Sequence, residues 1–203
     1  MRANTSEDEI LRLARRKIVQ SKELEARGVS RTRLRQLVAS GTLERLNRGL
    51  YMAPDFDFDE NISLAEVAMR CPKAVMCLLT ALRYHNLTTE NPQVVYIMLP
   101  QGSQRPHFSS PSVNVSWCNP TMLAAGVEEH LMSGVPVKIT SAAKTVVDCF
   151  KYRRIIGLPV AIEALHDAWQ QRKATADELW RYAKLCRMTN VMRPYFDSLM
   201  VRA

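Results

Sequence analysis

The stretch Val29–Pro54, VSRTRLRQLVASGTLERLNRGLYMAP, decides the fold of the N-terminal part of this chain. Ser30 is a residue type favoured at a helix N-cap, and Gly41 suits the left-handed conformation just beyond a helix end. The pieces TLERL and GLYMA then alternate as two short strands around NRG, where Gly49 can supply the positive φ of a tight turn. The stretch therefore predicts a helix followed by a β-ribbon.

The helix expected after Ser30 has two different faces. With successive residues roughly 100° apart, Leu34, Leu37 and Val38 lie on one narrow side, which packs. The opposite side carries no acidic residue, although a solvent face without a function normally mixes both signs. Arginine and glutamine present forked donors and acceptors that match guanine and adenine edges in the major groove. The acid-free side therefore predicts contact with nucleic acid, and it is formed by Thr32, Arg33, Arg35, Gln36 and Ala39.

Two shorter helices are expected before this one, in SEDEILRLARRK with Ser6 as N-cap and in SKELEARG, which ends at Gly28. A short helix, the tight turn RGVS and a second helix form a helix-turn-helix, and the ribbon that follows is its wing. Phosphate contacts from the wing and from backbone N–H groups near Ser30 would position the module, and the free helix face would specify sequence. The expected DNA-binding residues are Ser30, Arg31, Thr32, Arg33, Arg35, Gln36, Arg45, Asn47 and Arg48.

The charge distribution agrees with a basic N-terminal head. The chain has 203 residues and a net charge of +8. Residues 1–53 contain 12 Lys and Arg and 6 Asp and Glu, a net charge of +6. The corresponding numbers are 5 and 8 in residues 54–140 (−3) and 11 and 6 in residues 141–203 (+5). A positive domain attracts polyanions, chiefly nucleic acid, but +6 is also consistent with mere solubility. Two alternatives stay open: a basic helix and hairpin that bind nothing, and a winged helix used for protein contacts.

The acidic, proline-led segment PDFDFDENIS is the best domain boundary, because it has no helical period. It divides the chain into a winged helix-turn-helix domain of residues 1–54 and a C-terminal domain of residues 55–203. In the second domain we expect two helices broken at Pro72, and then four strands in QVVYIMLP, SVNVSWC, VEEHLMSG and VPVKIT. The last two strands would form a hairpin around Ser133 and Gly134.

Four helical segments are expected at the C-terminal end, and one of them begins with a capping box of Thr175 and Glu178. The order of helices and strands lacks the regular βαβ alternation of a nucleotide-binding sheet. The expected fold class is therefore α+β, with an N-terminal winged helix-turn-helix followed by a larger mixed α+β domain that has a small sheet and several helices.

The sequence composition indicates the cellular compartment. No apolar run approaches the roughly 20 residues needed to cross a bilayer, and MRANTSEDEILRLARRK lacks the apolar block of a signal peptide. The five cysteines are an odd number without a CxxC, which fits a reducing compartment better than disulfides or zinc. We therefore expect a cytoplasmic protein without a membrane partner.

Catalytic patterns are missing from the sequence. A metal-dependent nuclease would need a strand in which Glu or Asp lies two residues before a Lys. The strand VPVKIT has Lys138, but Pro136 occupies the position of the acidic residue. Glu128 and Glu129 are adjacent in a strand and point to opposite faces. The four histidines form no HxH or HxxxH, and neither GxSxG nor GxxxxGK[ST] occurs. We expect no catalytic residue, no metal site and no cofactor.

The N-terminal stretch ELEARGVSRTRLRQLVASGTLERLNRGLYMAP is followed by ENISLAEVAMRCPKAVMCLLTALRYHNLTT, VYIMLP and GVPVKITSAAKTVVDCFKYRRIIGLPVAIEALHDA. Together these segments resemble the AbiEi family of antitoxins from bacterial type IV toxin–antitoxin systems, over about Ile10 to Leu199. The winged helix is shared by many regulators and is weakly specific by itself. The combination of GLY at the end of the wing with CLLTALRYHNLT and TSAAKTVVDCFKYR is much more specific. The resemblance implies a non-enzymatic, two-domain protein of an abortive-infection (phage-defence) system. Its winged helix would bind inverted repeats in its own promoter and repress the operon.

The resemblance also implies that the C-terminal domain counters a nucleotidyltransferase-type toxin, with or without direct contact. A surface for this task would be centred on Lys144, Lys151, Arg153 and Arg154. The plain alternative for this segment is a capped helix with one ion pair between Lys144 and Asp148 and a solvated basic end.

Two further alternatives concern the whole protein. The alternative to an antitoxin is a stand-alone winged-helix transcriptional regulator whose C-terminal domain senses a ligand or binds a protein partner. A monomer or a weak dimer is expected, because inverted repeats can be filled by either and no coiled-coil heptad is present.

Overall fold

The structure, a computed structural model, describes residues 5–57 and 60–200. The described chain divides into two compact units. The first consists of the described residues up to Pro72 together with Leu131–Val137, and the second of Lys73–His130 and the described residues from Lys138 onward. The first unit thus ends later than the boundary expected after Pro54. Phe58 and Asp59 of the expected linker lie outside the described residues.

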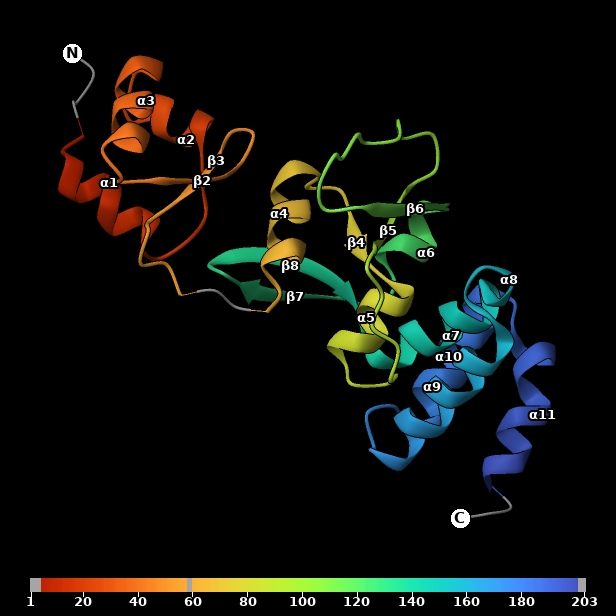
Figure 1. Cartoon of the computed structure of the whole chain (residues 1–203). Helices are drawn as coiled ribbons and strands as arrows, with labels where there is room; N and C mark the ends of the chain where they lie inside the picture. The colour runs from red at the N-terminus through yellow and green to blue at the C-terminus, as the bar shows by residue number, and fades with distance from the viewer. Residues whose placement is uncertain (1–4, 58–59, 201–203) are drawn as a thin grey trace. The chain divides into compact units, whose positions relative to one another are not determined.

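Three helices open the first unit (Figure 1). They are α1 (Glu7–Ala14), α2 (Ser21–Ala26) and α3 (Arg31–Ala39). Ser6 caps α1 in a capping box with Glu9, and Ser30 caps α3, since its Oγ accepts the Arg33 N–H at 3.2 Å. Gly28 and Gly41 follow α2 and α3 with φ of 87° and 75°. The helix starts and stops predicted from capping residues and glycines are therefore confirmed.

A three-stranded antiparallel sheet completes the winged helix. Its strands are β1 (Val19–Gln20), β2 (Glu44–Asn47) and β3 (Leu50–Met52), in the order β1-β3-β2. The ribbon β2–β3 and the positive φ of Gly49, 77°, were expected; β1 was not, because two residues show no alternation. The sheet and helices enclose one core, formed by Ile10, Ala14, Val19, Leu24, Val29, Leu34, Leu37, Leu43 and Ala53.

Helix α4 (Ile62–Arg70) belongs to this first unit because polar contacts hold it to the winged helix. The Gln20 side-chain amide donates to the carbonyl of Met69 at 2.9 Å, and the Asn47 amide donates to Glu66 Oε1 at 2.6 Å. These side-chain contacts explain why the unit extends to Pro72, and a composition change after residue 54 does not reveal them.

The second unit is built on a five-stranded mixed sheet (Figure 1). The strand order is β6-β5-β4-β8-β7; β4 pairs antiparallel with β5 and parallel with β8, and β5 pairs parallel with β6. The four expected strands are present, and the short β4 was not anticipated. The bounds are β4 (Val75–Met76), β5 (Val95–Pro100), β6 (Val113–Cys118), β7 (Val127–Met132) and β8 (Val135–Thr140).

The hairpin β7–β8 turns at Ser133 and Gly134, as expected, and both residues have positive φ, 48° and 71°. Its tip, Leu131–Val137, is counted in the first unit. A Cβ on Gly134 would collide with the carbonyl oxygen of Arg16 and would lie 2.9 Å from Lys17 Cα. The tip therefore packs directly on the backbone that follows α1.

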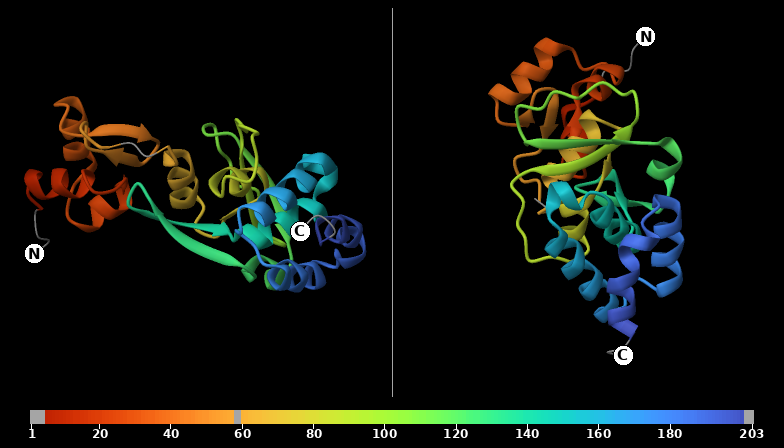
Figure 2. Two further views of the ribbon diagram at one scale, coloured as in Figure 1. Left: turned by 90° about the horizontal axis from the view of Figure 1, so that it is seen from below. Right: turned by 90° about the vertical axis from the view of Figure 1, so that its right-hand side faces the viewer.

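Seven helices belong to the second unit: α5 (Leu78–Tyr84), α6 (Pro120–Ala124), α7 (Ala142–Lys151), α8 (Arg153–Ile156), α9 (Leu158–Gln170), α10 (Ala176–Cys186) and α11 (Thr189–Met200). Helix α7 is central: it packs against α5, α9 and α10, and every residue from Ala142 to Phe150 is buried. In Figure 2 the helices coloured cyan to blue lie together in both views. The two units together have the α+β class expected. Helix α6 was not predicted, and the first of the four expected C-terminal segments is divided into α7 and α8.

Candidate nucleic-acid interface

The turn between α2 and α3 is fixed by backbone hydrogen bonds around a left-handed glycine. The N–H of Gly28 donates to Glu25 at 3.0 Å and the N–H of Val29 donates to Leu24 at 3.0 Å. Leu24 and Val29 are both buried, so a hydrophobic contact accompanies this Schellman motif. The helix-turn-helix geometry is therefore determined by ELEARGVS itself.

Helix α3 is divided into a packed and an exposed face, as its sequence predicts. Leu34 and Leu37 are 5% and 4% exposed, and Val38 is half-buried. Arg33 of the expected DNA face is half-buried too. The remaining expected residues of this face are exposed, namely Arg31, Thr32, Arg35, Gln36 and Ala39.

Arg31 makes an ion pair with Glu25 of α2, with Nε 3.0 Å from Oε1. Its side chain is 83% exposed, so water screens the pair and the pair is weak. The guanidinium can exchange this carboxylate for a phosphate without leaving the surface. Arg31 therefore suits a backbone contact better than a base contact.

The wing offers two exposed arginines, Arg45 and Arg48. Arg45 Nε donates to the Asn47 carbonyl at 3.3 Å, which keeps its side chain along the ribbon. Arg48 lies in the turn between the strands, next to Gly49. Both arginines are therefore exposed on the wing.

Asn47 departs from the expectation that it reaches DNA. Its Oδ1 accepts the backbone N–H of Arg48 at 2.7 Å, and its Nδ2 donates to Glu66 Oε1 at 2.6 Å. Both ends of the amide are thus engaged inside the protein. Asn47 shapes the wing turn and anchors it to α4, and we remove it from the DNA-contacting set.

Glu66 holds the wing residue Asn47, and the sequence did not predict this contact. Its side chain is 8% exposed, and Oε1 lies 2.8 Å from Arg70 Nη1 as well as within hydrogen-bond reach of Asn47. A buried carboxylate needs such partners, because desolvation without them is costly. The signal in the sequence was the (i, i+4) spacing of Glu66 and Arg70 inside the otherwise apolar ISLAEVAMR.

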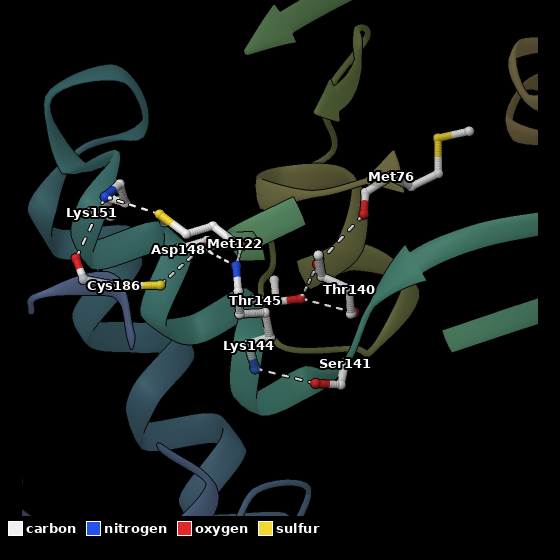
Figure 3. A network of polar contacts seen from close by, with 9 residues as sticks. All are labelled: Met76, Met122, Thr140, Ser141, Lys144, Thr145, Asp148, Lys151 and Cys186. Atoms are coloured by element: carbon white, nitrogen blue, oxygen red, sulfur yellow. Dashed lines mark hydrogen bonds and ion pairs between the residues drawn. The ribbon is translucent and has the colours of Figure 1, made fainter. Parts of the chain in front are cut away.

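The second expected site is the antitoxin surface of the C-terminal domain, and one of its four residues, Lys144, is buried. Lys144 is not on a surface: its side chain is 1% exposed, and Nζ lies 2.5 Å from both carboxylate oxygens of Asp148 (Figure 3). Burial lowers the pKa of Lys144, but the Asp148 charge outweighs it and raises that pKa above its ordinary value. The expectation that Lys144 belongs to an antitoxin surface was wrong, because α5, α9 and α10 cover α7.

The other three residues of that site lie at the end of α7 and in α8. Lys151 is half-buried, and Nζ lies 3.5 Å from the Cys186 carbonyl and 3.7 Å from Met122 Sδ. Arg153 is half-buried and donates to the Phe150 carbonyl at 2.8 Å. Arg154 is exposed, and its neighbour Ile155 is 55% exposed.

Comparison with known proteins connects the N-terminal unit to a family. Residues 8–54 match the family described as "Transcriptional regulator, AbiEi antitoxin". No curated protein sequence matches the chain. None of the helices in residues 5–57 and 60–200 is long and apolar enough to cross a membrane.

A solved structure shares the fold. It is the crystal structure of the RV2827C protein from Mycobacterium tuberculosis, which aligns with a TM-score of 0.56 and 16% identity over 87% of this chain and 70% of that chain. At this identity the likeness concerns the fold alone. The family match, by contrast, spans α1 to β3, the helix-turn-helix and wing described above. Residues 8–54, the winged helix of this chain, are thus similar to the family of AbiEi antitoxin transcriptional regulators.

Proposed function

We propose that this protein is a DNA-binding antitoxin that represses its own operon by binding inverted repeats in its promoter. One observation carries the proposal: the exposed face of α3 holds arginine, glutamine and threonine and no acidic residue. The family match of residues 8–54 supports the same role. No catalytic residue enters this proposal.

In the proposed complex, α3 lies in the major groove. Arg35 and Gln36 are exposed on adjacent positions and have the forked side chains that read guanine and adenine. Thr32 and Arg33 complete the face that reads base edges. The backbone is held by Arg31, by the N–H groups that follow Ser30, and by Arg45 and Arg48 of the wing. Two copies, as monomers or as a weak dimer, would fill the two halves of an inverted repeat.

The second part of the proposal concerns the toxin. We assign the countering of a nucleotidyltransferase-type toxin, in a cytoplasmic type IV abortive-infection system, to the C-terminal unit. The candidate surface is formed by Lys151, Arg153 and Arg154, with the exposed Ile155 beside them. Basic side chains near an exposed apolar one suit an acidic protein surface.

A gel-shift titration of the full chain tests the repressor role. The probe is the DNA upstream of its own gene, and the competitor is a scrambled fragment of equal length at the same salt concentration. We expect the native fragment to bind at least about 1,000-fold more tightly, the lower end for specific recognition. Equal affinity for both fragments would contradict specific repression.

A growth assay tests the antitoxin role separately. The toxic gene beside this one is expressed together with the full chain or with an Arg153→Ala/Arg154→Ala variant. We expect the variant to lose rescue while still binding the operator. As a control, Arg193→Ala removes an exposed arginine of α11 and should rescue fully. Full rescue by the double variant would exclude this surface, and the lack of any toxic neighbour would favour a stand-alone regulator.

A further inference from the structure

The second unit contains a pocket that shares only Lys151 with the candidate toxin-countering surface. It has a volume of about 370 Å³ and lies where α6 and the ends of α7 and α10 meet. This volume falls within the range of roughly 300–1,000 Å³ typical of small-molecule sites. The residues that line it include Asn119, Thr121, Met122, Lys151, Leu185 and Arg187.

The charge of this pocket is positive. Lys151 and Arg187 line it, and no carboxylate does. Among the residues that the structure describes, no Asp or Glu oxygen lies within 4 Å of the Lys151 ammonium or the Arg187 guanidinium. Asp148 lies deeper and is already neutralised by Lys144. An anion that enters the pocket therefore meets two cations and no competing acid.

Lys151 has room for such an anion. Its two contacts, with the Cys186 carbonyl at 3.5 Å and with Met122 Sδ at 3.7 Å, are at the long limit for hydrogen bonds (Figure 3). A lysine ammonium has three donors. The contact with the end of α10 can therefore persist while Lys151 binds a ligand.

Arg187 is held in an unusual backbone conformation at the pocket. It ends α10 with φ 58° and ψ 40°, the left-handed region, which costs an L-residue with a side chain about 1–2 kcal/mol. Glycine would relieve this strain, yet an arginine stands here. Its guanidinium offers a planar fork of N–H donors that fits the oxygens of a phosphate.

Two apolar side chains also line the pocket. Met122 presents a thioether, and Leu185 is a large hydrophobic residue left 37% exposed. Asn119 and Thr121 add an amide and a hydroxyl to the lining. The pocket therefore matches a molecule with a compact anionic group and a hydrocarbon or ring portion.

We propose that this pocket binds a small organic phosphate, with its phosphate on Lys151 and Arg187 and its carbon portion against Met122 and Leu185. A phosphate monoester carries about −1.5 to −2 charge at neutral pH, which balances the two cations. A monocarboxylate would leave one of them uncompensated. Binding here goes beyond DNA recognition and toxin control; it shares Lys151 with the candidate toxin-countering surface but needs neither DNA nor a toxin.

Isothermal titration of the full chain with phenyl phosphate tests the proposal, at constant ionic strength. We expect saturable binding, at least about tenfold tighter than that of inorganic phosphate or of benzoate. Arg187→Ala and Lys151→Met should each weaken it about tenfold or more, because each removes a charged hydrogen bond to the ligand. Circular dichroism of both variants checks that they remain folded.

Arg172→Ala is the matched control. Arg172 is also an exposed arginine with a left-handed φ, 55°, just after a helix, but it does not line this pocket. We expect its affinity for phenyl phosphate to stay within about twofold of the unaltered chain. The proposal is overturned by the absence of saturable binding, by equal losses in Arg172→Ala and Arg187→Ala, or by benzoate or inorganic phosphate binding as tightly.

Discussion

Lys144 and Asp148, one helical turn apart on α7, form an ion pair in which both side chains are only 1% exposed. Removing one partner leaves the other charged in the interior. Asp148→Ala should therefore lower the free energy of unfolding by about 3–5 kcal/mol, measured by urea denaturation. The double change Lys144→Met/Asp148→Leu removes both charges and should cost clearly less than Asp148→Ala alone. Equal losses would show that packing, not charge, dominates at this position.

The tip of the β7–β8 hairpin gives a second prediction, on stability. Gly134→Ala places a Cβ against the backbone of Arg16 and Lys17, whereas Gly41→Ala, at a similar positive φ, meets nothing within 4 Å. Gly41→Ala should therefore cost only the conformational penalty of about 1–2 kcal/mol. Gly134→Ala should cost clearly more by the same denaturation measurement. Equal costs would mean that the hairpin tip moves away freely.

We expect substitutions in α3 to reduce sequence specificity and substitutions in the wing to reduce affinity for any DNA. Arg35→Ala removes an exposed side chain of the reading face and should reduce discrimination against scrambled DNA by about 1–3 kcal/mol. Arg48→Ala should weaken binding to all sequences alike and make the slope of log affinity against log salt shallower by about one unit. Gel shifts at several salt concentrations measure both. Identical behaviour of the two variants would argue against α3 as the reading helix.

Asn47 should behave as a support of the wing and not as a DNA contact. Asn47→Ala deprives the buried Glu66 of its 2.6 Å hydrogen bond and should destabilise the protein by about 1–3 kcal/mol. Its salt slope for DNA should equal that of the unaltered chain, in contrast to Arg48→Ala. A reduced slope with unchanged stability would return Asn47 to the contacting residues.

The capping box of α10 predicts an acid-sensitive contribution to stability. The Thr175 backbone N–H and hydroxyl both donate to Glu178 and hold the pKa of Glu178 below its ordinary value. Because this pKa is lowered in the folded state, the stabilisation is present above the unfolded pKa, near 4.5, and is lost as pH falls through the folded pKa. Thr175→Ala should cost about 1 kcal/mol at neutral pH. That cost should shrink on acidification, as denaturation at a series of pH values would show.

The sequence predicts best those features that depend on neighbouring residues. The caps Ser6, Ser30 and Thr175 and the left-handed Gly28, Gly41 and Gly49 all lie where local rules place them. The two faces of α3 follow from helical period alone. These local features make up the whole helix-turn-helix and its ribbon, which is why the candidate DNA interface was largely predictable.

Features that depend on distant contacts were not predictable in this way. The two-residue strands β1 and β4 form because distant strands pair with them: β3 with β1, and β5 and β8 with β4. The spacing of Lys144 and Asp148 indicated an ion pair, but its burial depends on the packing of α5, α9 and α10. Similarly, Asn47 looked available for DNA because the sequence does not show that Glu66 approaches it. Tertiary packing determines whether a polar side chain is exposed for binding or forms contacts inside the protein.

The β7–β8 hairpin has a practical consequence for dissecting this protein. Its tip, Leu131–Val137, packs with the N-terminal unit although nearly 60 residues of the second unit precede it in the chain, from Lys73 to His130. A single cleavage after the wing would leave the DNA-binding part without α4 and without this tip, and would strip the remainder of the surface on which the tip packs. Truncated halves would therefore differ from the same segments in the intact chain. Point substitutions in the full-length protein are the sounder way to assign separate roles to its two ends.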